Sequence, residues 1–137
     1  MPEKHQIDLA DYRLEKAKER LQSAATLIAS GSFSDSVGRS YYAIFTAARA
    51  LLALKGLDSK KHSGVISLFN IHFIKSGVLD KEAYQTIANA KAKRERADYE
   101  DFVEFSHDEA ANQLTKAKEF IEKVEQVLMD LKKDSMS

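Results

Sequence analysis

The residues best suited to chemistry form a dense charge cluster that runs from Lys91 to Asp101. On a helix, Arg94 and Asp98 would share one side, whereas Arg96 and Glu100 would share the opposite side. The basic residues of this cluster form the local patch through which the chain could contact a polyanion. The alternative is a solvated helix face whose internal ion pairs contribute only ~0.3–0.5 kcal/mol each.

A further arginine, Arg39, lies in a helical segment that is apolar on two sides. An unpaired buried charge is costly, so this arginine needs a partner or a water-filled opening. Two placements are open at this point. Arg39 is the buried partner of Asp98 or another carboxylate, or it lines the same pocket as Arg94 and Arg96.

The histidines are weaker candidates for a site. His62 would cap or line the start of a helix, and His72 would pack beside Phe73. Glu104 and His107 have the Glu-x-x-His spacing of a carboxylate-bridged di-iron bundle. That site needs a second copy of the motif, and the sequence contains none. We therefore expect no metal site and no cofactor.

The spacing of apolar residues and glycines predicts five helices. Gly31, Gly56 and Gly77 each follow an apolar-periodic run, and glycine is common just beyond the last residue of a helix. Ser106 with Glu109 has the pattern of a capping box, which starts a helix. The predicted helices cover residues 8–30, 34–55, 61–75, 80–99 and 106 onward.

The apolar patterns of these helices indicate how they pack. The helix over residues 34–55 has a broad apolar face and a second face of small side chains, which is typical of the central helix of a bundle. The last helix has a seam that would also suit a coiled coil, but a matching seam on the first helix favours packing within the chain. We therefore expect one all-α, up-and-down bundle of about five helices over residues 1–137, with a frayed tail at 132–137.

Composition limits the classes of function. The chain has 137 residues, with 21 Lys and Arg against 21 Asp and Glu, so only a local patch could attract nucleic acid. It has no cysteine, which excludes disulfides and cysteine-ligated zinc. The N-terminal residues lack the apolar core of a signal peptide, and no apolar run approaches the ~20 residues that cross a bilayer. We expect a cytoplasmic protein with no membrane contact.

Three segments of the chain resemble the HEPN domain. They are Arg39–Phe45, His62–Ile66 with Phe69, and Arg96–Tyr99, in the right order over almost the whole chain. The small single-domain prokaryotic branch of the family is the most similar. The resemblance implies an all-α bundle that commonly dimerises. Many such domains are metal-independent endoribonucleases of toxin–antitoxin and defence systems, whereas others bind RNA or nucleotides, often beside a minimal nucleotidyltransferase.

The chain departs from the family's catalytic signature, an arginine followed after four to six intervening residues by a histidine. Four residues separate Arg94 from Tyr99, and six separate Arg96 from Val103, so the histidine is missing. Ionising a tyrosine with a pKa near 10 costs about 4 kcal/mol at pH 7, so Tyr99 is a poor base. Its ring could still stack on a nucleobase.

The sequence therefore predicts a homodimeric binding module for RNA, a nucleotide or a partner protein such as a nucleotidyltransferase, with little or no cleavage. Arg94 and Tyr99 are the candidates for any residual catalysis. Two alternatives stay open: a metal-independent endoribonuclease toxin, and a structural module whose helical seams recruit a partner helix. The candidate binding residues are Arg39, His62, Arg94, Arg96, Asp98 and Tyr99.

Overall fold

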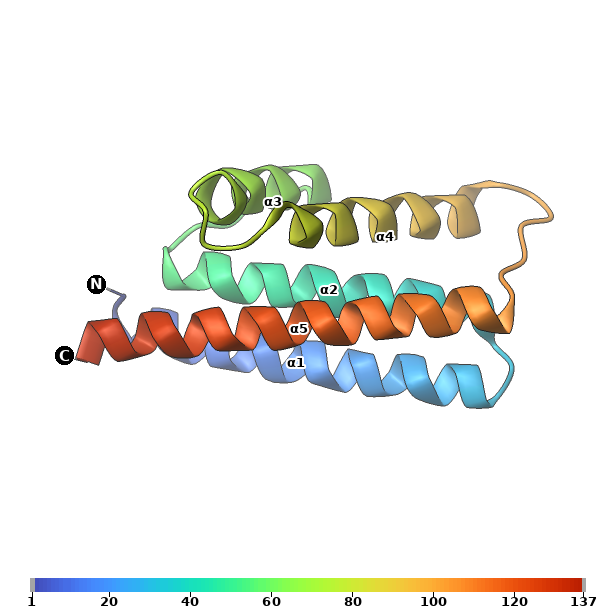
Figure 1. Cartoon of the computed structure of the whole chain (residues 1–137), viewed down its shortest axis with the longest axis horizontal. Helices are drawn as coiled ribbons and strands as arrows, with labels where there is room; N and C mark the ends of the chain where they lie inside the picture. Colours follow the sequence, from blue (N-terminus) through green and yellow to red (C-terminus); the bar gives the residue numbers. More distant parts are fainter. Residues whose placement is uncertain (1, 137) are drawn as a thin grey trace.

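The computed structural model describes residues 2–136, which form an elongated helical bundle (Figure 1). No strand occurs within residues 2–136, so the predicted all-α bundle of five α-helices is confirmed. No helix in this part of the chain is both long and apolar enough to cross a membrane. The helices are α1 (Lys4–Ala29), α2 (Phe33–Leu54), α3 (His62–Phe69), the short π-helix η1 (Asn70–Ile74), α4 (Lys81–Tyr99) and α5 (His107–Met136).

The helix α2 is the centre of the bundle, as its two apolar faces predicted. It packs against α1, α5, α4 and α3, so little of its surface remains for solvent. The broad apolar face and the face of small side chains are both buried, because each has a helix against it. The buried residues of these faces are Val37, Tyr41, Ala43, Ile44, Ala47, Ala48, Ala50, Leu51, Leu52 and Leu54.

The seams of α1 and α5 pack inside the same core. Leu14, Ala17 and Ala24 of α1 are buried. Most seam residues of α5 are buried where α5 packs on α1 and α2, and Leu114 is half-buried. The buried ones are Ala110, Ala117, Ile121, Val124 and Leu128. The heptad spacing of α5 therefore serves packing within the chain, and these seams are not free to recruit a partner helix.

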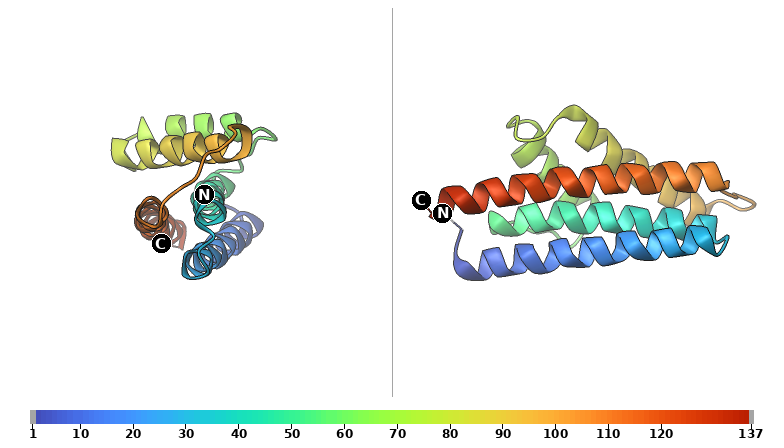
Figure 2. Two further views of the ribbon diagram at one scale, coloured as in Figure 1. Left: turned by 90° about the vertical axis from the view of Figure 1, so that its right-hand side faces the viewer. Right: turned by 60° about the horizontal axis from the view of Figure 1, so that its bottom comes forward.

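The remaining helices form a layer over this core. Figure 2 shows α3, η1 and α4 lying on one side of α2 and α5, with α1 on the opposite side of α2. The segment after α2 rises from the core into this layer, and α3 begins there with His62. The start of α3 is therefore held where α2 and α4 face each other.

One predicted helix boundary is wrong, and one predicted helix differs in type rather than in extent. The predicted third helix, 61–75, is α3 followed by the π-turn η1, in which the Lys75 N–H donates to the Asn70 carbonyl at 2.8 Å. The first helix begins at Lys4 rather than near residue 8, because Glu3 and Gln6 form a capping box there. Both differences come from backbone hydrogen bonding that apolar periodicity does not report.

The predicted start of the last helix is confirmed. The Ser106 N–H donates to Glu109 Oε1 at 3.2 Å, and the Glu109 N–H donates to Ser106 Oγ at 3.1 Å. At its other end α5 runs to Met136, through most of the predicted frayed tail. Lys132 Nζ donates to Asp11 Oδ1 at 2.8 Å, which ties this segment to α1. Residue 137, the last of the predicted tail, lies outside the described residues.

Candidate functional site

A cluster of aromatic and titratable side chains lies where α2, α3 and α4 meet. The Tyr41 hydroxyl is 2.9 Å from His62 Nδ1, and the rings of Phe45 and His62 have centroids 4.2 Å apart. The Arg94 guanidinium carbon lies 4.9 Å from the ring centroid of Tyr42 and 5.6 Å from that of Tyr41. We call Tyr41, Tyr42, Phe45, His62 and Arg94 the His62–Arg94 site.

Helical spacing explains how α2 contributes three aromatic rings. Tyr41 and Phe45 are one turn apart and stack with centroids at 5.7 Å, and Tyr42 lies beside Tyr41 on the same helix. Tyr41 is fully buried, whereas Tyr42 is half-buried and keeps part of its ring at the surface. The aromatic floor of the site is therefore built into the central helix of the core.

Arg94 is held in the site from its own helix. Its Nε lies 3.2 Å from Asp98 Oδ2, one turn further along α4. The Arg94 side chain is 23% exposed, so the guanidinium is only partly removed from water. A guanidinium has five N–H donors, and Asp98 is the only ion-pair partner of Arg94 within residues 2–136. Donors therefore remain for a ligand.

The surroundings of His62 favour its neutral form. Burial lowers the pKa of His62 below its ordinary value, and the nearby charges of Arg94, Lys91 and Arg49 lower it further. The imidazole is therefore neutral at pH 7 and has one nitrogen that can accept a proton. If Nδ1 donates to the Tyr41 oxygen, the accepting nitrogen is Nε2. If Tyr41 donates to Nδ1, then Nε2 carries the proton.

Tyr41 keeps its proton. Burial raises the pKa of Tyr41 to about 12; the positive charge of Arg94 opposes this shift, while Tyr42 and Glu95 add to it. The hydroxyl is thus a hydrogen-bonding group at every physiological pH, and its role is to orient the imidazole of His62. The site then offers a neutral base, a fixed positive charge and aromatic surfaces for a base to stack on.

The structure separates Arg96 from this site. Two residues along a helix correspond to a rotation of about 200°, so Arg94 and Arg96 leave α4 on opposite sides, as the sequence predicted. Arg96 Nε lies 3.6 Å from Glu100 Oε2, and its guanidinium carbon is 5.8 Å from the Phe105 ring centroid. The predicted arginine patch is therefore two separate features.

Tyr99 also lies apart from the cluster. It is the last residue of α4, and its side chain is 79% exposed. Five residues along a helix correspond to about 140°, so Tyr99 does not share the side of α4 that carries Arg94.

The predicted placements of Arg39 are both wrong. Arg39 is exposed in a shallow groove between α1 and α2, beside Glu19 and Gln22. Asp98, its proposed partner, pairs with Arg94 instead. The reason is the phase of the helix: Arg39 precedes Tyr41 by two residues and so points to the side of α2 opposite the site.

His72 and His107 both lie in helices, next to aromatic residues. His72 is half-buried in η1, directly before the buried Phe73. His107 lies at the start of α5 with its ring edge-on to Phe33, at 5.6 Å between centroids. Within residues 2–136, no group of three or more His, Asp or Glu residues is arranged to hold a metal ion.

Sequence reasoning missed the contribution of the aromatic residues to the site. The Tyr41 ring lies in the core, as the broad apolar face of its helix predicts, but its hydroxyl reaches His62. The available signal was chemical: three large aromatics at 41, 42 and 45 stand in a helix otherwise rich in alanine. His62 and Arg94 were both named as candidates, and the structure brings them to the same pair of tyrosines.

The fold and site describe a small all-α bundle with a polar site between its central helix and a two-helix layer. A family model, the HEPN domain, matches residues 10–127. A UPF0332 protein of Thermotoga maritima is 35% identical over 133 residues, which cover 97% of this chain and 99% of the relative. The chain belongs to the HEPN family.

Two other relatives extend this comparison. A protein of Methanocaldococcus jannaschii named "Putative toxin MJ0142" is 36% identical over 116 residues, which cover 85% of this chain and 79% of the relative. A UPF0332 protein of Pyrococcus horikoshii is 50% identical over 64 residues, which cover 47% of this chain and 45% of the relative.

Proposed function

We propose that this protein binds single-stranded RNA at the His62–Arg94 site, with little or no cleavage. The observation that carries the proposal is the meeting of Arg94 and His62 over the rings of Tyr41 and Tyr42. Proteins that bind single strands combine positive charge for the backbone with aromatic rings on which bases stack. The half-buried ring of Tyr42 is the surface on which a base would stack.

Arg94 is the residue that would hold the phosphate. It is paired with one carboxylate and is partly exposed, and Lys91 adds a second positive charge near His62. Lys91 itself pairs with Glu95 at 3.4 Å, so the local excess of positive charge is small. Because the chain has no net charge, we expect modest and salt-sensitive binding.

A second candidate is a metal-independent endoribonuclease, which the position of His62 favours. The family's histidine is missing from α4, but α3 supplies a neutral histidine to the same tyrosines that Arg94 covers. In such a reaction the 2′-oxygen attacks the adjacent phosphorus, and its proton passes to His62 Nε2. This step uses the tautomer in which His62 Nδ1–H donates to the Tyr41 oxygen. The bond to the 5′-oxygen breaks, that oxygen takes a proton from water, and a 2′,3′-cyclic phosphate remains.

Dimer formation and a nucleotidyltransferase partner also stay proposals for this chain. HEPN domains commonly dimerise, and light scattering at micromolar concentration would test this directly. We expect twice the sequence mass of 15.4 kDa, and a clean monomer would contradict the proposal.

The arginines of α4 provide the sharpest test of RNA binding, because Arg96 is a matched control for Arg94. Binding of a labelled single-stranded RNA of about ten nucleotides would be measured by fluorescence anisotropy in EDTA. Arg94→Gln should weaken binding about tenfold or more, since a charged hydrogen bond contributes about 1.5–3 kcal/mol. Arg96→Gln should change it far less. Equal effects of the two substitutions, with folding intact, would contradict the proposal.

A further inference from the structure

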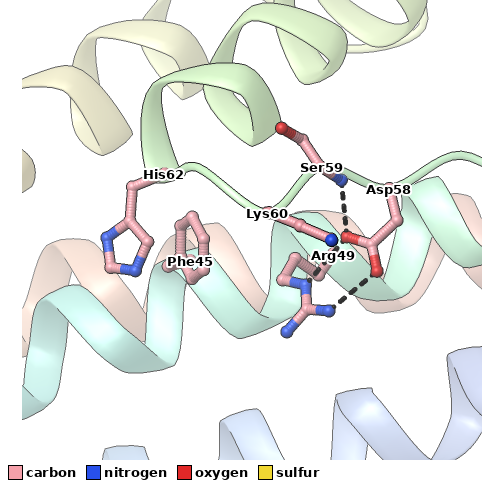
Figure 3. Close-up of a pocket in the computed structure, with 6 residues that line it drawn as sticks. All are labelled: Phe45, Arg49, Asp58, Ser59, Lys60 and His62. Atoms are coloured by element: carbon pink, nitrogen blue, oxygen red, sulfur yellow. Dashed lines mark hydrogen bonds and ion pairs between the residues drawn. The ribbon is translucent and has the colours of Figure 1, made fainter.

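We propose that a pocket beside His62 is a second phosphate subsite, which takes a neighbouring phosphate of the RNA strand held at Arg94. The inference rests on the proposed function and extends it. Figure 3 shows the pocket between α2 and the segment that leads to α3, with the imidazole of His62 at one edge. Its volume is about 540 Å³, and it is lined by Phe45, Arg49, Asp58, Ser59, Lys60 and His62.

The cations of the pocket are positioned by the protein itself. Arg49 donates two hydrogen bonds to the carboxylate of Asp58, at 2.9 Å and 3.3 Å (Figure 3). Arg13 of α1 reaches the same carboxylate at 3.4 Å and donates to the Arg49 carbonyl at 3.2 Å. The two guanidiniums are therefore held in place before any ligand arrives, which lowers the entropy cost of binding.

Positive charge exceeds negative charge around this pocket. Two guanidiniums share one carboxylate, and Lys60 forms no ion pair within residues 2–136. Burial lowers the pKa of Arg13, and the like charge of Arg49 lowers it further, while Asp58 opposes the shift. An anion bound here would offset the repulsion between the cations.

The Asp58 carboxylate already accepts hydrogen bonds from Arg13, Arg49 and the Ser59 N–H. Burial acts to raise the pKa of Asp58, but hydrogen bonds from Arg49 and the Ser59 N–H outweigh it, so the pKa lies below its ordinary value. Asp58 is thus a fixed structural anion that organises the arginines. Its single negative charge faces the positive charges of Arg13 and Arg49, and Lys60 also lines the pocket, so positive charge remains in excess there.

The wall of the pocket is built against the first turn of α3. A Cβ on Gly64 would overlap the Ser59 side chain, so the glycine lets the loop approach the helix closely. Ser59 Oγ also accepts a hydrogen bond from the Lys61 N–H at 3.3 Å. The segment that carries Asp58 and Lys60 is therefore fixed in position.

His62 connects the pocket with the proposed RNA site. Its ring lines the pocket, while its Nδ1 bonds to Tyr41 in the His62–Arg94 site. Burial is the main cause of its lowered pKa, and the charges of Arg94, Lys91 and Arg49 lower the pKa further. His62 thus lines the same pocket as Arg49 and shares Tyr41 with Arg94. A strand that crosses His62 would place one phosphate at Arg94 and another in the pocket. Repeated anions beside aromatic rings match a nucleic acid.

The first experiment removes one positive charge from the pocket. Lys60→Gln is compared with Lys118→Gln, an exposed lysine of α5 that forms no ion pair within residues 2–136. For the single-stranded RNA probe, Lys60→Gln should lower the slope of log K against log salt by about 0.7 and weaken binding about threefold at low salt. Lys118→Gln should leave both values near those of the wild type.

The second experiment looks for a gain of affinity, because a variant with a damaged fold would bind RNA more weakly rather than more tightly. Asp58→Asn removes the carboxylate charge but keeps an oxygen that accepts from the Ser59 N–H and from Arg49 Nε, so Arg49 stays in place. Loss of the competing negative charge should then tighten RNA binding about threefold at low salt. Glu119→Gln, an exposed carboxylate of α5 with no ion pair among residues 2–136, is the control. Thermal unfolding of each variant verifies that it is folded.

The outcomes separate this inference from the proposed function. If Arg94→Gln weakens RNA binding while Lys60→Gln and Asp58→Asn match their controls, the RNA site stands and the subsite is wrong. If the wild type binds no RNA, the proposed function fails. Titration with AMP then tests whether the pocket binds a phosphate group. AMP binding that Lys60→Gln weakens and Asp58→Asn strengthens would support a phosphate site for free nucleotides. Absence of AMP binding would overturn the subsite as well.

Discussion

The hydroxyl of Tyr41 lies 2.9 Å from Nδ1 of His62 and joins the central helix to the first residue of α3. The tyrosine is fully buried and the histidine half-buried, so the bond lies at the border between the core and the surface. Through this contact the core sets the orientation of the imidazole. The other ring nitrogen, Nε2, is then the one that can meet a ligand.

Tyr41→Phe should therefore disturb His62 more than it disturbs the fold. Loss of one hydrogen bond should cost about 0.5–1.5 kcal/mol in the free energy of unfolding, measured by chemical denaturation. The ring ¹⁵N chemical shifts of His62 should report one tautomer in the wild type and a mixture of both tautomers in Tyr41→Phe. Tyr42→Phe is the control, because the Tyr42 hydroxyl makes no hydrogen bond found within residues 2–136. An unchanged tautomer in Tyr41→Phe would contradict the orienting role.

The pKa of His62 predicts how stability depends on pH. Folding lowers this pKa, mainly by burial, so the unfolded chain binds a proton on His62 more readily than the folded protein does. The stability that the neutral, buried His62 allows is fully present above the unfolded-state pKa of about 6.5. Part of this stability is lost as the pH falls below that value, because the unfolded chain takes up the proton first. His62→Gln should thus lose less stability than the wild type between pH 7 and pH 5, measured by urea denaturation. A wild type that loses no more than the variant would contradict this.

The close approach of Gly64 to Ser59 gives a prediction about the loop. Gly64→Ala should destabilise the protein by about 1–3 kcal/mol, because the new methyl group would overlap the serine side chain. Ser59→Gly removes that side chain, so the double variant should regain most of the lost stability in thermal unfolding. If the second substitution restores nothing, the predicted clash is not the cause.

Cleavage of RNA distinguishes the two candidate functions. In EDTA, the wild type should cleave single-stranded and structured RNA slowly or not at all, because Tyr99 stands where the family has a histidine. A gain of cleavage in Tyr99→His would support a nuclease fold that has lost its base. Strong wild-type cleavage that is abolished by both Arg94→Ala and His62→Gln would instead establish the endoribonuclease, with His62 as its base.

The fold could be predicted from the sequence because its signals are local. The two apolar faces of α2, the paired seams of α1 and α5 and the capping box at Ser106 each follow from spacings of a few residues. The phase of α4 likewise separated Arg94 from Arg96 before the structure was known. Helical periodicity carries this information directly.

The site could be predicted only in part because its contacts are distant in sequence. Tyr41 and His62 are 21 residues apart, and Arg94 comes from another helix, so their meeting depends on how the segments between helices bend. The predicted position of Arg39 is wrong because it assumes that the apolar helix α2 is buried on all sides. The helix α2 leaves a strip at its surface, and Arg39 lies on it.

Backbone and side-chain NMR during an RNA titration tests the central claim most directly. A single-stranded RNA of about ten nucleotides would be added in EDTA at low salt. We predict that the largest shifts occur at Tyr42, His62 and the Nε–H of Arg94, and that Arg39 and the exposed face of α5 change little. Shifts centred on Arg39, or none at all in the presence of excess RNA, would contradict RNA binding at the His62–Arg94 site.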